Sequence, residues 1–317
     1  MNVIIIIFFI SYGLYSFLNN LKFWFIYIIL LGTYYFLTQY KIINQYYENV
    51  RRKVCLSAWK TPYDPQTYTT MKLDITKIIP YLKKKSEEIK EHITPTIFTI
   101  KLMAIILKKY PEVYGYIKFG RYETKNGVDI CCLVQVGGGQ ELANTTIVDC
   151  EKKNFKIITE ELVSSVKLLR ERKNKDQNKK MALFKFIPTY IMGPATQILS
   201  YLSSIGMKFK SVGLKKFEFG SCVITSIGSL GIADSYAPIP PLTFAPLLLT
   251  LCSRYDVNIK DENGNIFTKS YVKMNFTSDC RFFDTYSAAA IMKDIHLIGE
   301  DPELFEKECK KYESEEN

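Results

Sequence analysis

The stretch that decides the fold of this chain reads Ser278-Asp279-Cys280-Arg281-Phe282-Phe283-Asp284-Thr285. It follows a segment, 272–278, with the pattern of a β-strand, and it precedes a segment, 285–297, with the pattern of a helix. The stretch is therefore predicted to be a strand-to-helix loop that carries a thiol, a guanidinium and a carboxylate close together. What this loop can do chemically depends on one side chain, Cys280.

Length and charge limit the class of protein. The chain has 317 residues with 47% hydrophobic and 14% aromatic content, enough to bury one large core beside a smaller appendage. Its formal charge of +10 suits an acidic ligand, such as a nucleotide-bearing cofactor, or the anionic surface of a membrane. No nucleic-acid recognition motif with the required spacing is found, so no nucleic-acid partner is expected.

The eight cysteines are scattered without Cys-x-x-Cys pairs, and the chain has only two histidines. A zinc site or another metal centre is therefore not expected. Free thiols in a reducing compartment are the simplest interpretation.

The amino-terminal 40 residues are predicted to be a transmembrane segment. Residues 3–37 are almost continuously apolar, with a polar interruption at Asn19-Asn20-Leu21-Lys22. Each half is shorter than the roughly 20 residues of a straight membrane helix, so a helical hairpin and a single tilted span both remain open, as does a buried hairpin of a soluble protein. Basic residues follow the apolar run at Lys41 and 51–53, which predicts that the globular domain faces the cytosol. Residues 41–66 are the expected juxtamembrane linker.

The rest of the chain alternates between helical and strand patterns. Strands are predicted at 67–73, 127–136, 219–227 and 272–278, and helices at 75–90, 94–107, from 155 onward, 196–210 and 285–297. Interleaved strands and helices favour an α/β (α+β) two-layer sandwich spanning 67–305. An apolar insert at 181–216 is interpreted either as an interfacial helix touching the membrane or as an extra helix covering the core. Residues 306–317 form an acidic tail.

Four short motifs, in this order along the chain, resemble the catalytic domain of the dihydrolipoyl acyltransferases of the 2-oxoacid dehydrogenase complexes, which share the chloramphenicol acetyltransferase fold. The resemblance covers roughly residues 50–305 and is greatest to stand-alone members of the family that lack the motif histidine. In the signature His-x-x-x-Asp-Gly of the family, this chain has Cys280 for the histidine and Thr285 for the glycine. The motifs are Tyr110-Pro111-Glu112-Val113, Gly127-Val128-Asp129-Ile130, Thr225-Ser226-Ile227-Gly228-Ser229-Leu230-Gly231 with Ala237-Pro238-Ile239, and Asp279 to Asp284 before Asp301-Pro302-Glu303.

The resemblance implies a homotrimeric, CoA-dependent acyltransferase with each active site shared by two subunits. It assigns Thr225 as the hydrogen-bond donor to the oxyanion and Asp284 as a structural ion-pair residue that orients the loop. Ser226 and Arg281 are then the expected contacts of the acyl-CoA. Thr285 leaves the turn after Asp284 uncertain, because glycine accepts a positive φ and threonine does not.

The role of Cys280 decides between an active and an inactive protein. An ordinary thiol is mostly protonated at neutral pH and is a poor general base. Cys280 could instead be a nucleophile activated by Arg281, or a small apolar replacement for the histidine. Neither His92 nor His296 is placed by sequence near Thr225. Two hypotheses follow, namely a membrane-anchored acyltransferase acting on an unknown acceptor and an inactive scaffold or acyl-CoA-binding module.

Overall fold

The structure is a computed structural model of the whole chain. It describes residues 65–136, 141–171, 189–209, 213–240, 243–260 and 265–313, together with short pieces at 11–13, 26, 28–30 and 32–33. The predicted transmembrane segment and juxtamembrane linker lie mostly outside these residues. Within the described part of the chain, no helix has both the length and the apolar character that crossing a bilayer requires.

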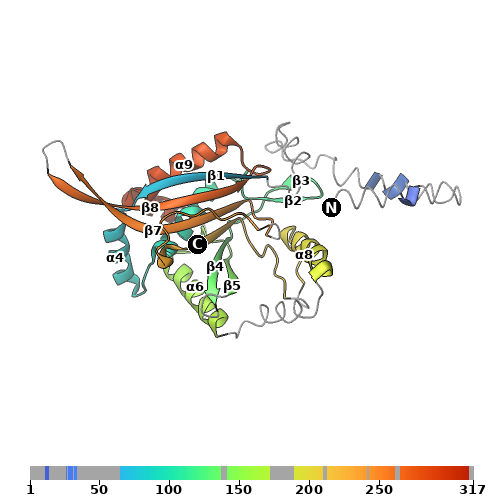
Figure 1. Cartoon of the computed structure of the whole chain (residues 1–317), viewed down its shortest axis with the longest axis horizontal. Coiled ribbons are helices and arrows are strands. Elements are labelled where there is room, and N and C mark those ends of the chain that lie inside the picture. The colour runs from blue at the N-terminus through green and yellow to red at the C-terminus, as the bar shows by residue number, and fades with distance from the viewer. Residues whose placement is uncertain are drawn as a thin grey trace.

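A mixed six-stranded sheet forms the centre of the molecule (Figure 1), in the order β1-β8-β7-β6-β4-β5. The short strand β6 pairs in parallel with both β7 and β4, and the remaining pairs are antiparallel. A separate two-stranded hairpin is formed by β2 (Tyr116–Lys118) and β3 (Arg121–Glu123). The six strands are β1 (Gln66–Asp74), β4 (Ile130–Val136), β5 (Glu141–Ile147), β6 (Cys222–Ser226), β7 (Leu247–Lys260) and β8 (Ile266–Asp279).

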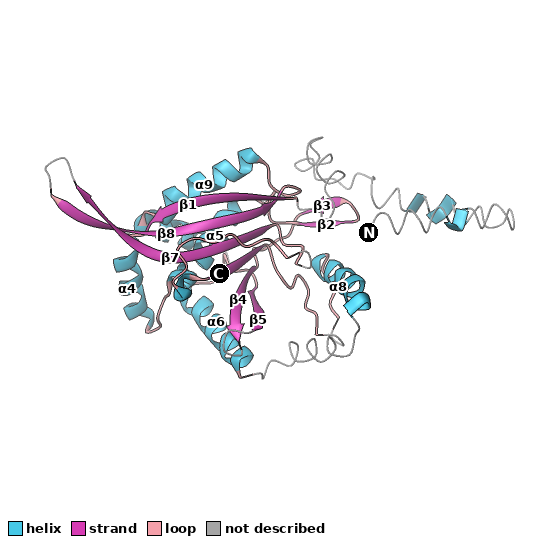
Figure 2. Ribbon diagram, viewed as in Figure 1, coloured by secondary structure: helices cyan, strands magenta, loops and turns pink. Residues whose placement is uncertain are grey.

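Helices cover one face of the sheet (Figure 2) and enclose the main core. The central helix is α5 (Pro95–Lys109), which begins where the sequence predicts: Thr94 caps it by accepting from the Ile97 N–H, and Pro95 occupies the first turn. Residues 97–107 of this helix are all buried, because other helices pack around it. These are α4 (Ile78–Ile89), α6 (Phe155–Arg170), α9 (Thr285–Gly299) and α10 (Pro302–Glu313).

The opposite face of the sheet is covered by an irregular segment between β6 and β7. Alternation along β4 separates the two faces, since Ile130 and Cys132 belong to the helix-side core while Cys131 packs with Val223 and Ile239 on the other side. This segment contains the short 3-10 helix η3 (Gly228–Leu230) and the sequence 237–245. The predicted two-layer α/β arrangement is therefore confirmed, with loops over the second face.

Several elements differ from the sequence prediction. Strands β5 and β7 were not expected, and β8 begins six residues earlier than the predicted strand at 272–278. The helix predicted at 196–210 is α8 (Thr189–Ser204), with Pro194 inside it. The expected acidic tail at 306–317 contains a packed helix as far as Glu313, because α10 buries Cys309 and Tyr312.

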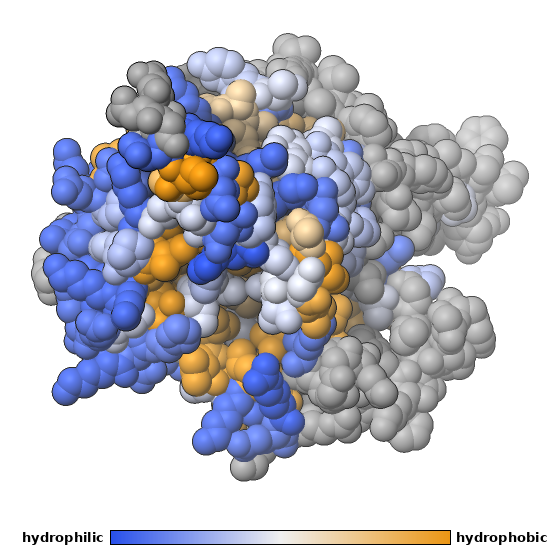
Figure 3. Space-filling view, turned by 60° about the vertical axis from the view of Figure 1, so that its left-hand side comes forward, coloured by the Kyte–Doolittle hydropathy of each residue, from blue (hydrophilic) through white to orange (hydrophobic). Residues whose placement is uncertain are grey.

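The outer halves of β7 and β8 form a two-stranded hairpin that projects beyond the rest of the sheet (Figure 1). Figure 3 brings this end of the molecule forward and shows apolar patches between mainly polar side chains. The hairpin lies at the opposite end of β8 from Cys280, so it takes no part in the loop described next.

Candidate functional site

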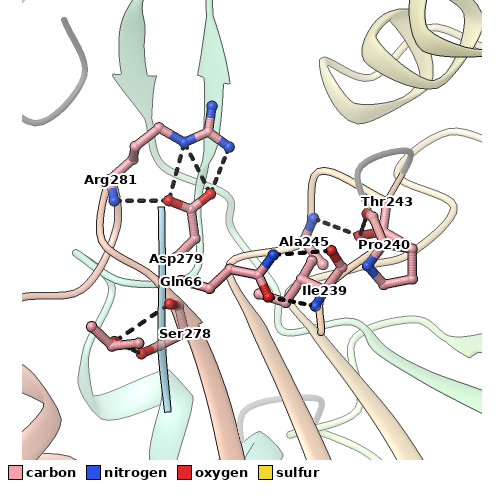
Figure 4. Close-up of polar contacts among 9 residues, drawn as sticks. Gln66, Ile239, Pro240, Thr243, Ala245, Ser278, Asp279 and Arg281 are labelled. Atoms are coloured by element: carbon pink, nitrogen blue, oxygen red, sulfur yellow. Dashed lines mark hydrogen bonds and ion pairs between the residues drawn. The ribbon is translucent and has the colours of Figure 1, made fainter. Parts of the chain in front are cut away.

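The loop after β8 is organised by an ion pair between Asp279 and Arg281, which lie two positions apart in the chain. Asp279 is the last residue of β8 and only 4% exposed, and its carboxylate accepts from the Arg281 backbone N–H at 2.8 Å and from Arg281 Nε at 2.9 and 3.0 Å. A further bond from Nη2 completes a forked contact, visible in Figure 4. The charge of Arg281 is therefore engaged by Asp279 directly beside Cys280.

The loop is also held against distant parts of the chain. The backbone N–H of Cys280 donates to the Pro65 carbonyl at 2.7 Å, and that of Asp279 donates to the Pro246 carbonyl at 3.0 Å. Next to it, the Gln66 amide both accepts from the Ile239 N–H at 2.8 Å and donates to the Ile239 carbonyl at 3.3 Å (Figure 4). These bonds fix the Cys280 backbone between the start of β1 and the segment that leads into β7.

Asp284 caps helix α9. Its Oδ1 accepts from the Ser287 N–H at 2.7 Å, and its φ of −109° is extended backbone. Thr285 is the first helical residue, a position that needs no positive φ, so the threonine fits where the family motif has glycine. The doubt about this turn is thereby resolved. The structure shows Asp284 as a helix cap and pairs Arg281 with Asp279. The structural ion pair that the resemblance assigns to Asp284 stays a prediction.

Cys280 differs from the other cysteines that the structure describes, because it is half-buried while the other six are buried. Burial raises the pKa of Cys309 to about 12 and also raises the pKa of Cys222. Arg281 is the cation expected to activate Cys280, but its guanidinium is forked onto Asp279. This pairing weakens the case for Cys280 as an activated nucleophile.

A small hollow lies beside the loop and is called here the Arg281 hollow. Arg281 and Phe282 form one side, and Tyr201 and Ser204 of α8 lie across from them, with Ile117 and Phe244 completing the lining. Tyr201 is fixed in place because its hydroxyl accepts from the Phe119 N–H at 2.8 Å. The carboxyl-terminal half of α8 therefore packs against the folded domain, which supports the interpretation of this part of the insert as a core-covering helix.

Thr225 lies in a row of polar side chains that crosses the loop-covered face of the sheet. It pairs in register with Thr250, which pairs with Asn275, which pairs with Thr70. The Thr70 hydroxyl donates to Asn275 Oδ1 at 2.9 Å, and Asn275 Nδ2 donates to the Asp234 carboxylate at 2.7 Å. Thr225 and Ser226 are both half-buried at the end of β6. The hydrogen bonds of this row therefore tie β1 and β8 to the segment at 234–236.

Thr225 and Cys280 lie well apart within one copy of the chain. Thr225 is in register with Asn275, from which Cys280 is five residues further along β8 and two strands away across the sheet. Strand rise and spacing convert this into roughly 20 Å between the two residues in one chain. A hydroxyl and a thiol so far apart cannot act on the same carbonyl, so one copy of the chain does not bring the two residues together.

Neither histidine replaces the missing base. His296 is exposed near the end of α9 and pairs with Glu300 at 2.9 Å, and His92 is exposed before α5. His296 belongs to α9, which packs in the helix-side core, whereas Thr225 lies on the loop-covered face of the sheet. That His92 lies away from Thr225 stays a prediction. In the described part of the chain no group of acidic, histidine or cysteine side chains could hold a metal ion.

Sequence reasoning missed the residues that hold the site from a distance. Gln66 bonds Ile239, and Tyr201 and Phe244 line the Arg281 hollow together. Both arrangements join segments that lie far apart in the chain, and no local sequence pattern indicates them. Asp279 was also missed as the partner of Arg281, because two opposite charges close together in a loop do not show by themselves that they pair.

Comparison with known proteins separates the first half of the chain from the second. Residues 44–184 match the family model described as 2-oxoacid dehydrogenases acyltransferase (catalytic domain). The resemblance to this acyltransferase family is confirmed. The matched part ends before β6, so it contains neither Thr225 nor Cys280.

A curated relative, the dihydrolipoyllysine-residue succinyltransferase component of the 2-oxoglutarate dehydrogenase complex of Staphylococcus saprophyticus, is 34% identical over 110 residues. This stretch covers 33% of the present chain and 26% of the relative, so the chain spans only about a quarter of that protein. Activity and partners of the whole relative therefore do not transfer directly.

Solved structures show the same fold. The cubic core of the pyruvate dehydrogenase multienzyme complex aligns with a TM-score of 0.55 at 15% identity, covering 75% of this chain and 83% of that one. A probable dihydrolipoamide acetyltransferase of Listeria monocytogenes aligns with a TM-score of 0.54 at 15% identity, covering 87% and 96%. At these identities the likeness extends to the fold alone, and it includes the second half of the chain that the family model does not match.

Proposed function

We propose that this chain is a membrane-anchored protein of the acyltransferase family that transfers an acyl group from a CoA thioester to an acceptor. The observation that carries the proposal is the acyltransferase fold with a half-buried Thr225 at the end of β6. In the transfer, a nucleophile on the acceptor would attack the thioester carbonyl, and the CoA sulfur would leave and take a proton. Thr225 would donate a hydrogen bond to the oxyanion that forms between these two steps.

The transfer would be slow because Cys280 supplies no efficient base. A general base is typically worth about 100- to 10,000-fold in rate, or roughly 3 to 5 kcal/mol of transition-state stabilisation. Ser226, next to the donor, and Arg281, beside the Arg281 hollow, remain the proposed contacts of the acyl-CoA. Asp284 would act as a positioning residue through its cap on α9, without touching the substrate.

The proposed working unit is a homotrimer. Its support is the separation of roughly 20 Å between Thr225 and Cys280 in one chain, estimated from strand geometry. Two copies packed so that the end of β6 in one faces the Cys280 loop of the other would form a shared site. The similarity to a chain from the cubic core of a multienzyme complex agrees with assembly from repeated copies.

The membrane anchor remains a proposal based on the sequence. The apolar run at 3–37 is interrupted only at 19–22, and basic residues follow it at 41 and 51–53. We propose that this segment attaches the globular domain to the cytosolic face of a membrane.

The second candidate function is an inactive scaffold or acyl-CoA-binding module. The specific observation in its favour is the forked contact between Arg281 and Asp279, which engages the cation that follows Cys280 in the chain. With the charge of Arg281 engaged by Asp279, the support for Cys280 as an activated nucleophile is weaker.

Replacement of Cys280 by histidine separates the two functions. The full chain in detergent would be incubated with radiolabelled acetyl-CoA and with longer acyl-CoAs, and CoA release would be measured for wild type, Cys280→His and Cys280→Ala. We expect Cys280→His to raise the rate about 100-fold or more, because it restores a base beside an intact loop. The double variant Cys280→His with Thr225→Ala should lose most of that gain.

The scaffold function would be favoured if Cys280→His bound acyl-CoA but released no more CoA than Cys280→Ala. Mass photometry of the same preparations tests the shared site, since a monomer with full activity would contradict it.

A further inference from the structure

The part of the chain that contains α8 carries most of the net positive charge. Residues 172–216 include ten lysines and arginines and a single acidic residue, Asp176, whereas the whole chain has 42 basic and 32 acidic residues. Nine of the ten net positive charges therefore belong to this part, and the rest of the chain is close to neutral. Such a concentration of one sign of charge favours a partner of the opposite sign.

The described residues of α8 do not bury their apolar side chains. Of residues 194–204 only Ser203 is buried, whereas Ile198 is 54% exposed and Leu199 and Leu202 are half-buried. A helix that covers a core along its whole length shows the reverse pattern, with apolar side chains inside and polar side chains outside. The apolar side chains of α8 therefore remain open to an apolar phase outside the folded domain.

Polar contacts hold the last turn of α8 against the folded domain. The Tyr201 hydroxyl accepts from the Phe119 N–H at 2.8 Å, and the Ser203 hydroxyl donates to the Lys215 carbonyl at 2.7 Å. The Ser203 carbonyl also accepts from the Phe217 N–H at 3.0 Å. These bonds fix the direction of the helix, so the exposure of its apolar side chains follows from the fold.

The turn that ends α8 extends the apolar strip by one residue. Gly206 has φ +92°, and its N–H donates to the Ser203 carbonyl at 3.0 Å. The Met207 N–H donates to the Leu202 carbonyl at 3.0 Å, and in this type of helix end such a pair of side chains commonly makes an apolar contact. Leu202 lies one helical turn after Ile198. We therefore expect Ile198, Leu202 and Met207, which is 46% exposed, to lie in one strip.

Two lysines face each other directly after this strip. The backbones of Phe209 and Leu214 exchange two hydrogen bonds of 3.1 Å, which form an antiparallel bridge. This register places Lys208 opposite Lys215, and both side chains are exposed. Like charges directly opposite each other are unfavourable, and no carboxylate of the described residues pairs with either lysine. The pair therefore points to an anion that comes from outside the chain.

The combination of an apolar strip with adjacent lysines fits one kind of partner best. A helix that lies in the interface of a bilayer places its apolar side chains at the boundary with the acyl chains, and its lysines reach the anionic headgroups. A second copy of this part of the chain would bring the same excess of positive charge, so it fits the lysine pair less well.

We propose that Ile198, Leu202, Met207, Lys208 and Lys215, together called the α8 surface, dock onto a bilayer that contains anionic lipids. The apolar strip enters the interface, and the two lysines contact the headgroups. This docking differs from the proposed amino-terminal anchor, because it depends on lipid charge and belongs to the globular domain. It also does not depend on the acyl transfer proposed above.

Hydrogen exchange of the full chain, followed by mass spectrometry, tests the proposal in two kinds of lipid nanodisc. One contains phosphatidylcholine alone, and the other contains phosphatidylcholine mixed with phosphatidylserine. We expect the amides of 196–207 to exchange at least about tenfold more slowly in the anionic discs, because docking removes this segment from water. Peptides from α4, at the other end of the folded domain in Figure 1, should exchange equally in both.

Charge reversal shows whether the lysine pair causes the effect. The double variant Lys208→Glu with Lys215→Glu should remove the difference between the discs, because each lysine near an anionic surface strengthens binding about fivefold. The matched control is Lys83→Glu with Lys84→Glu, which reverses two exposed lysines of α4 and changes the net charge equally. It should leave the slow exchange of 196–207 unchanged. Circular dichroism checks that both variants are folded.

Equal exchange of 196–207 in the two kinds of disc would overturn the proposal, as would slow exchange that persists in the Lys208→Glu, Lys215→Glu variant. Exchange as slow in detergent as in the anionic discs would also overturn it, because a second copy would then cover α8. The amino-terminal anchor is read separately, since it predicts that the chain joins the neutral discs as well. No acyl-CoA is present, so the outcome leaves the proposed acyl transfer untouched.

Discussion

The hydrogen bonds of the Cys280 loop, residues 279–284, and of the Thr225 row, formed by Thr70, Asn275, Thr250 and Thr225, join partners at different separations along the chain. In the loop, Asp279 bonds Arg281 and Asp284 bonds Ser287, so the partners are two or three residues apart. In the row, Thr70 bonds Asn275, and Asn275 bonds Asp234, so the partners come from three separate segments. The loop therefore keeps its shape through local bonds, whereas the row depends on the whole sheet and on the segment that covers it.

This comparison distinguishes the contacts that hold the candidate site in shape from the side chains that would take part in a reaction. The loop retains an ion pair and a helix cap, although the position of the motif histidine holds a thiol. The row retains a threonine hydroxyl at the end of β6, although one chain holds it far from that thiol. The parts that hold the loop and the row in place are therefore present in each copy, while in the proposed homotrimer the reacting groups would come from two copies.

Thiol labelling should show the largest contrast between the loop and the buried core. Under native conditions a maleimide should modify Cys280 at least about 100-fold faster than Cys309, because Cys309 is buried and burial raises its pKa to about 12. Mass spectrometry of peptides after timed quenching measures both rates in one sample. Equal rates at the two positions would mean that the loop is closed or that α10 opens easily.

The second contrast sets the buried pair in the loop against an exposed pair on the β7–β8 hairpin. Asp279→Ala leaves the Arg281 guanidinium, 12% exposed, without its carboxylate, and we expect the free energy of unfolding to fall by about 3 kcal/mol. Asp256→Ala is the matched control, because its partner Arg254 is half exposed, at 50%. Its effect should be close to the error of urea unfolding. If both variants behaved alike, the pair in the loop would have no special structural role.

Local signals explain how much of this molecule the sequence could predict. Thr94 and Pro95 mark the start of α5 because a cap and a first-turn proline act within one turn of helix. The strand-to-helix change around Cys280 was found for the same reason. Strand β7 was missed, because its inner half is buried on both faces and so carries no alternation.

The site was less predictable than the fold. Sequence placed Thr225, Ser226, Cys280, Arg281 and Asp284 on the correct elements, but it could not show that Arg281 turns toward Asp279. Nor could it show the Arg281 hollow, whose walls come from α8, strand β2, the segment before β7 and the loop after β8. Such juxtapositions arise from long-range packing, which leaves no periodic signal in the chain.

The smallest expected effect concerns the outer end of the Thr225 row. Hydrogen bonds from Lys273 and Asn275 lower the pKa of Asp234 below its ordinary value of 3.8. A depressed folded-state pKa means that the stabilisation is complete above the unfolded pKa and is lost as the pH falls through the folded one. The difference in unfolding free energy between wild type and Asp234→Asn should therefore be present at pH 6 and should shrink at a pH well below 3.8. Urea unfolding at both pH values measures this difference, and a difference that grew on acidification would show that Asp234 does not hold the covering segment through its charge.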